Sequence, residues 1–221
     1  MRVNVSTRSG RVRVEGRDGA GLRVEGGTIE RDDDGTVRIA AATGGSHSVS
    51  VVVPAGTDVI VGTASGRVEL RGSLGDVRVT TASGKIIVDA ARSVDIRTAS
   101  GTIDIGEVAG ACRVVTKSSR VSVGSVANLD CSAVSGRIEV GGVQDASVRT
   151  VSGRIDLGTQ ATGRVEVRSV SGKVELAVPR DRRPATTLKT VSGRVRCECE
   201  NGTDGEISVA TTSGTIDVRC R

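Results

Sequence analysis

The sequence of 221 residues contains no Phe, Tyr or Trp, one Met, one His and only three Pro. Without aromatic rings the interior must be filled by small and β-branched side chains, which disfavours a helical globule. No run approaches the roughly 18 apolar residues of a membrane-spanning helix, and no signal-peptide core follows Met1. We therefore expect a cytoplasmic protein, or an envelope-associated one if the sequence belongs to a longer parent protein or is recruited to the envelope.

A Ser-Gly dipeptide recurs along the chain, and its spacing indicates how the chain is organised. From Ser65 to Ser213 the copies follow one another at intervals of 17 to 21 residues, which lengthen toward the C-terminus. The serines of the copies are Ser9, Ser65, Ser83, Ser100, Ser135, Ser152, Ser171, Ser192 and Ser213, with Ser118-Ser119 as a variant. So short a repeat of strand patterns cannot bury its own apolar face and must stack on its neighbours. We predict an all-β fold, a single-stranded parallel β-helix (β-solenoid) with coils of 17–21 residues.

Within each copy the residues alternate between apolar and polar, as a strand with two faces requires. Val148 and Ile155 represent columns that are apolar in nearly every copy, and we predict that these columns form the core. Gly153 represents the glycines that turn the chain at a corner, because glycine adopts conformations that a Cβ forbids. A column of Thr two residues before the Ser is expected to face inward, where its hydroxyls can bond to each other and to the turn.

The repeats are less regular at the N-terminus. We predict that residues 1–55 form irregular coils that cap the solenoid and that residues 56–221 form its regular repeats, as one domain overall. Asp32–Gly35 has the composition of a hairpin turn, and a strand over Ser48–Val53 should end at Pro54. Near the other end, Pro179–Pro184 interrupts the pattern as a basic surface loop.

The recurring Thr-x-Ser-Gly-x-Ile/Val-x-Val copies, with Val-Pro-Ala-Gly-Thr at Val53–Thr57, resemble the bacterial "putative adhesin" family of β-strand repeats. This domain of unknown function is found in many actinobacteria and firmicutes, and the resemblance covers residue 28 to the end. It implies a right-handed parallel β-helix, often attached to the cell envelope and in some members linked to envelope stress. It implies no catalytic residues.

The residues with catalytic or metal-binding chemistry are spread out. One acidic column is spaced along the repeats rather than clustered, unlike the paired carboxylates of enzymes that cleave polysaccharides. Its members are Glu69, Asp104, Glu139, Asp156, Glu175 and Asp217. His47 has no ligand pattern around it, and the five cysteines match no zinc or haem motif. We expect no enzymatic activity, no cofactor and no metal site.

Two of the cysteines are expected to lie close together. Cys199 and Cys220 each follow their motif Ser by seven residues, which places them in adjacent coils of one column. A spacing near 4.8 Å between coils is compatible with a disulfide. The alternatives are therefore a disulfide or a close pair of thiols, and a reducing cytoplasm would favour the thiols.

A further pair of columns suggests an interaction surface. Valines directly before the Ser face outward by parity, and basic residues directly follow the Gly. These residues are Val134, Val151, Val170 and Val191, beside Arg137, Arg154, Lys173 and Arg194. An apolar stripe bordered by an evenly spaced ladder of cations suits a binding surface. The alternative is that the turn covers the valines and that the charges form a lattice of ion pairs, each worth about 0–1 kcal/mol.

These patterns support two hypotheses of different classes. The first is a noncatalytic binding or scaffold module that presents the ladder to an anionic envelope polymer, a membrane surface or a protein partner. Nucleic acid is disfavoured, since stacking aromatics are missing and the basic columns have acidic neighbours two residues on. The second hypothesis is a self-assembling structural protein whose solenoid ends stack into filaments, as in the bacterial bactofilins. A polysaccharide-active enzyme is the disfavoured third.

Overall fold

The computed structural model describes residues 1–33, 35–41 and 48–221, and these ranges contain strands and turns with no helix. Accordingly, nothing in them is a helix long and apolar enough to cross a membrane. His47 lies outside the described residues. The chain divides into two compact units, Met1–Ala109 and Gly110–Arg221, and the long strand β7 (Asp58–Thr159) contributes to both. The expected single domain and the boundary at residue 55 stay predictions.

Unit 1 begins with a coil made of β1 (Arg2–Thr7) and β2 (Arg11–Arg17). Both strands pair in parallel with the start of β7, with Arg2 opposite Asp58 and Arg11 opposite Arg67. Their valines alternate with polar residues, and Val3 and Val5 are fully buried. The N-terminal copy of the repeat is therefore a regular part of the stack.

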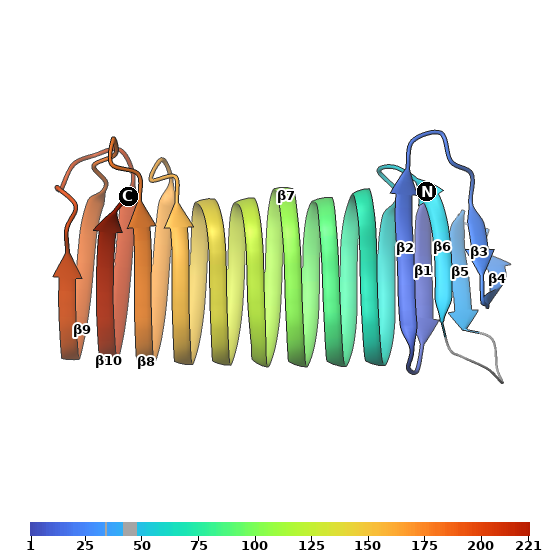
Figure 1. Ribbon diagram of the computed structural model, residues 1–221, viewed down its shortest axis with the longest axis horizontal. Coiled ribbons are helices and arrows are strands. Elements are labelled where there is room, and N and C mark those ends of the chain that lie inside the picture. The colour runs from blue at the N-terminus through green and yellow to red at the C-terminus, as the bar shows by residue number, and fades with distance from the viewer. Residues whose placement is uncertain (34, 42–47) are drawn as a thin grey trace. The chain divides into compact units, whose positions relative to one another are not determined.

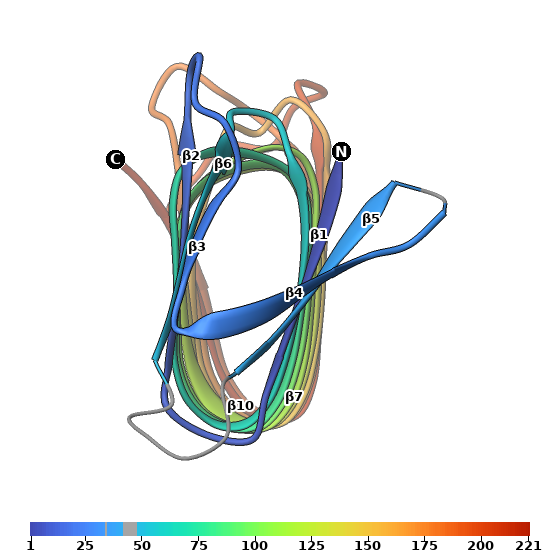
Figure 2. The same ribbon diagram turned by 90° about the vertical axis from the view of Figure 1, so that its right-hand side faces the viewer.

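The next segment of unit 1 lies outside this first coil rather than between it and β7. The strand β5 (Thr36–Ala41) pairs in parallel with β1, and β6 (Val49–Pro54) pairs in parallel with β2. Two short strands that precede them in the sequence form the edge of the sheet: β3 (Arg23–Glu25) pairs antiparallel with β6, and β4 (Gly27–Arg31) pairs antiparallel with β5. The views in Figures 1 and 2 agree that the β4–β5 hairpin lies across the end of this unit's coil. The hairpin and the strand ended by Pro54 are thus present in the cap region.

Unit 2 stacks successive repeats in parallel and in register. The strand β8 (Arg164–Val178) follows the end of β7 residue by residue, with Val148 opposite Val167 and Ile155 opposite Val174. These apolar columns are buried, since Val148 and Val174 are 0% exposed and Ile155 is 1% exposed. The core predicted from the repeat is therefore confirmed, and the all-β coils support the solenoid prediction. The hand of the winding stays a prediction.

Corner glycines allow neighbouring coils of unit 2 to approach closely. Gly153 has a φ of 148°, and a Cβ on it would lie 2.2 Å from the carbonyl oxygen of Gly136. Gly172 repeats the contact on Gly153. Beside the corner, the hydroxyl of Thr150 donates to the carbonyl of Ser152 (3.2 Å), so the inward Thr column bonds to the turn backbone as predicted.

The order of the last two coils differs from the sequence order. The C-terminal strand β10 (Glu206–Cys220) pairs in parallel with β8 on one side and with β9 (Ala185–Cys197) on the other (Figure 1). It is thus inserted between two strands that precede it. The connections at residues 179–184 and 198–205 make this possible, because six to eight extended residues reach farther than the roughly 10 Å between alternate coils.

Candidate interaction face

The outward valines lie at the corner of each coil in unit 2. Val134, Val151 and Val170 are 52%, 50% and 51% exposed, so the turn covers only half of each side chain. Val151 and Val170 lie in register, because the residues on either side of them are paired between β7 and β8. The close contact between Gly136 and Gly153 places Val134 in the preceding coil. The three side chains therefore form an apolar stripe across consecutive coils.

Cations border this stripe on the far side of the corner. Arg154 lies opposite Lys173, and Arg137 holds the same place one coil earlier. The side chain of Arg137 is 43% exposed, that of Arg154 44% and that of Lys173 37%. We call Val134, Val151, Val170, Arg137, Arg154 and Lys173 together the valine–basic face.

Acidic neighbours pair with the cations of the valine–basic face. Arg137 lies 3.3 Å from Glu139, while Lys173 lies 2.6 Å and Arg154 4.0 Å from Glu175. Partly exposed pairs of this kind are worth about 0–1 kcal/mol each. An incoming anion can therefore replace a carboxylate at little cost, and the lattice of ion pairs does not by itself prevent binding.

The prediction of four evenly spaced valines and cations is wrong for the last of the four coils. Because β10 lies between β8 and β9, Thr215 stands between Lys173 and Arg194. In the valine column Thr212 likewise separates Val170 from Val191, which is 84% exposed on β9. Equal spacing thus extends over three coils, and Val191 and Arg194 belong to a separate surface.

A groove of about 610 Å³ runs along the acidic column and was not predicted from the sequence. Glu139, Asp156 and Glu175 line it, with Arg219 near them. A column of small residues six positions after the motif Ser leaves this space: Gly124, Gly141, Gly158 and Ala177. That column is visible in the repeat and could have indicated the groove.

Two of the carboxylates that line the groove are stacked on each other. Asp156 lies opposite Glu175. Burial, and then the neighbouring Glu175, raise the pKa of Asp156, whereas Lys173 is the main cause of a lowered pKa at Glu175. Glu175 is thus the carboxylate that pairs with Lys173 and Arg154. Among the residues that the structure describes, no three His, Cys, Asp or Glu side chains are grouped to hold a metal ion.

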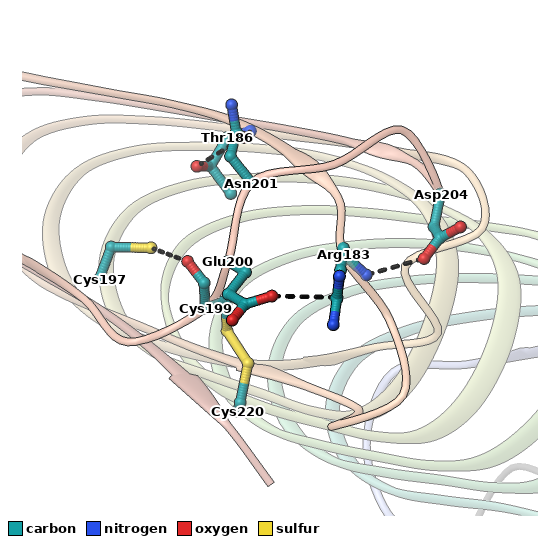
Figure 3. The surroundings of a disulfide bond; sticks show 8 residues. All are labelled: Arg183, Thr186, Cys197, Cys199, Glu200, Asn201, Asp204 and Cys220. Carbon is teal, nitrogen blue, oxygen red and sulfur yellow. Dashed lines mark hydrogen bonds and ion pairs between the residues drawn. A yellow bond between two sulfur atoms is a disulfide. The ribbon is translucent and has the colours of Figure 1, made fainter.

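The cysteines occupy two different environments. Cys199 and Cys220 form a disulfide with a Cα separation of 5.5 Å, which ties the segment after β9 to the end of β10 (Figure 3). Cys197 is free and exposed, with its Sγ 3.7 Å from the carbonyl oxygen of Cys199. Cys112 and Cys131 are buried, and burial raises the pKa of each thiol to about 12. They are core residues rather than reactive ones.

Polar contacts also join the segments on either side of β9. Arg183 lies 3.1 Å from Glu200, and its backbone N–H donates to Asp204 (2.8 Å). The amide oxygen of Asn201 accepts from the backbone N–H of Thr186 (2.8 Å). The segments before and after β9 are therefore linked, as Figure 3 shows.

Of the comparisons with known proteins, the family models identify a domain family. The family model described as Toastrack DUF4097 matches residues 1–219. A solved structure described as a "putative cell adhesion protein" from Clostridium sporogenes aligns with a TM-score of 0.23 and 10% sequence identity. That alignment covers 100% of this chain and 92% of the other. A search of curated proteins finds no match.

Proposed function

The chain belongs to the Toastrack DUF4097 family, and we propose that it is a noncatalytic β-solenoid binding module whose contact surface is the valine–basic face. The observation that carries the proposal is the half exposure of three valines in consecutive coils beside three cations. Isolated surface valines are ordinary, but an apolar stripe with a charged border is typical of an interaction surface.

An anionic polymer of the cell envelope is the partner that this arrangement suits best. Cations repeated at about 4.8 Å along a stiff axis match closely spaced negative groups. Each contact is weak because the cation already has a carboxylate neighbour, so affinity must come from several contacts made at once. Such binding should weaken steeply with salt. The resemblance to adhesin-like repeats favours an envelope role.

A pair of variants with equal charge change tests the proposal. Arg154→Gln with Lys173→Gln removes two cations from the valine–basic face. Arg149→Gln with Arg168→Gln removes two cations that are also in register, but on the strand segment before the corner. Each pair lowers the formal net charge of +5 by two, so any difference reports position. Sedimentation with polyphosphate or with vesicles containing phosphatidylglycerol, at low salt, measures binding.

We expect the face pair to weaken binding about tenfold and the control pair to leave it nearly unchanged. Thermal unfolding should be similar for both, since all four side chains are on the surface. If both pairs reduce binding equally, the attraction depends on net charge alone. If neither has an effect, the cations form only a solvated lattice and the proposal fails.

Filament formation through the solenoid ends is the alternative, and one observation favours it. The outer edge of β9 has no strand partner in the part of the chain that the structure describes. Light scattering of the purified protein over a range of concentrations would detect end-to-end assembly. The cytoplasmic location expected from the sequence stays a prediction.

A further inference from the structure

The strand β9 leaves an uncovered edge at the end of unit 2. Among residues 1–33, 35–41 and 48–221, its only strand partner is β10. The inward column shows the consequence, because Ile155 and Ile216 are 1% and 0% exposed, whereas Val195 at the same place in β9 is 41% exposed. Leu188, on the inward column of the preceding segment, is also partly exposed, while its partner Val209 in β10 is buried. Interior positions of the repeat are thus open to solvent on β9.

This edge has only one of the usual protections of a free strand, namely charged side chains. Natural proteins shorten edge strands, add proline or charged side chains, or cover them, because unpaired N–H and C=O groups invite another strand. In unit 1 the outermost strands β3 and β4 are short and antiparallel, with three and five residues. By contrast β9 has 13 residues and contains no proline. It offers a long template for a further parallel or antiparallel strand.

The charge of β9 selects the kind of strand that can add. Its outward side chains include Lys189, Arg194 and Arg196, and Ala185–Cys197 contains no acidic residue. Within the described chain, Lys189 and Arg194 take part in no ion pair, while Arg196 lies 3.5 Å from Glu198. On its covered side β9 already accepts Ile216-Asp217-Val218, with Asp217 opposite Arg196. Apolar residues facing inward and a carboxylate facing outward are therefore compatible with this strand.

We propose that the free edge of β9 is a β-augmentation site for an acidic extended segment of a partner protein. Apolar residues of that segment would cover Leu188 and Val195, and its carboxylates would lie beside Lys189 and Arg194. Cross-strand pairs of opposite charge stabilise such an arrangement. The Cys199–Cys220 disulfide holds the segment after β9 on β10, so the edge keeps its place when a strand adds. This site is independent of the valine–basic face.

A second copy of the chain fits the edge less well. Antiparallel pairing of two β9 strands would bring the three cations of one copy among those of the other, and like charges in facing strands repel. The outermost strand β4 of another copy has only five residues to offer to a strand of 13. The charge of the edge therefore favours an acidic partner.

The strand that β9 already accepts provides the probe. A peptide with the sequence of Glu206–Val218 carrying Ala210→Glu and Thr215→Glu would place carboxylates opposite Lys189 and Arg194 in the register of β10. A lysine peptide carries Ala210→Lys and Thr215→Lys instead. Isothermal titration measures the binding of both peptides to the whole chain with its disulfide intact. Hydrogen exchange locates the bound peptide.

We expect the wild-type chain to bind the acidic peptide about tenfold tighter than the lysine peptide. The variant Lys189→Glu with Arg194→Glu should reverse that preference, whereas Arg149→Glu with Arg168→Glu, the same charge change away from the edge, should keep it. Amide exchange should slow in Ala185–Cys197 and stay unchanged in β10.

Three results would overturn the proposal. The first is equal binding of both peptides, or no binding of either up to about 1 mM. The second is faster exchange in β10, which would mean that the peptide replaces β10 instead of adding to β9. The third is self-association of the wild-type chain that changes with Lys189→Glu and Arg194→Glu, which would make the occupant a second copy.

Discussion

Ile155 tests the arrangement of the interior most directly. It is 1% exposed and lies opposite Val174, with Ile138 holding the same place one repeat earlier and 2% exposed. The Ile155→Asp variant loses the burial of an isoleucine, worth about 1.5–3 kcal/mol. It also places a carboxylate among aliphatic side chains, where an unpaired charge costs several kcal/mol more or must take up a proton. A total of about 5 kcal/mol or more is comparable with the whole stability of a typical domain.

The same repeat position on β9 provides the control. Val195 is 41% exposed, so an aspartate there stays hydrated. We expect Val195→Asp to cost less than about 1 kcal/mol and Ile155→Val about 1 kcal/mol. Urea unfolding followed by circular dichroism should show little change for these two variants, and Ile155→Asp should be largely unfolded without denaturant. Equal midpoints for Ile155→Asp and Val195→Asp would refute the assignment of Ile155 to the interior.

Two further predictions concern titrating groups. Iodoacetamide near pH 8 should label Cys197 alone in the folded protein, because Cys112 and Cys131 are buried with their pKa raised to about 12 and the other two cysteines form a disulfide. Mass spectrometry checks this, and comparable labelling of Cys112 would contradict its burial. Hydrogen bonds from Arg92 and Ser93 lower the pKa of Asp76 from 3.8 to about 2. The modest stabilisation by this half-exposed carboxylate should be complete above about pH 4 and lost as the pH falls through 2. The acid dependence of urea midpoints should therefore be shallower in Asp76→Asn, and an unchanged dependence would count against the pairing.

The repeat predicts the interior well because each coil obeys the same local rules. Apolar alternation around the Ser-Gly corner correctly placed Val148 and Ile155 in the core, and it placed the Thr column inward at the turn. These outcomes depend only on strand parity and on a glycine corner. Because every copy repeats the same pattern, the assignment of inward and outward positions can be checked from one copy to the next.

The order of the coils at the C-terminus could not be predicted in this way. Coils with the same column pattern can stack in either order, since Val174 and Val195 would each cover Ile216 equally well. Only the connections distinguish the two orders, and they lie outside the pattern. The longer intervals after Ser171 were the visible signal. They allow the chain to pass over one coil and return, which removed Arg194 and Val191 from the expected ladder.

In each unit an inner position of the sheet is taken by the first or the last strand of the described chain. In unit 1 the N-terminal strand β1 has parallel neighbours on both sides, β5 and β7. In unit 2 the last strand β10 lies between β8 and β9. The strands β1 and β10 are each held by two ladders, whereas the outermost strand β9 lies between β8 and β10 in the sequence and is joined to both. The free edge of β9 therefore belongs to a segment fixed at both ends, which suits a surface that receives another strand.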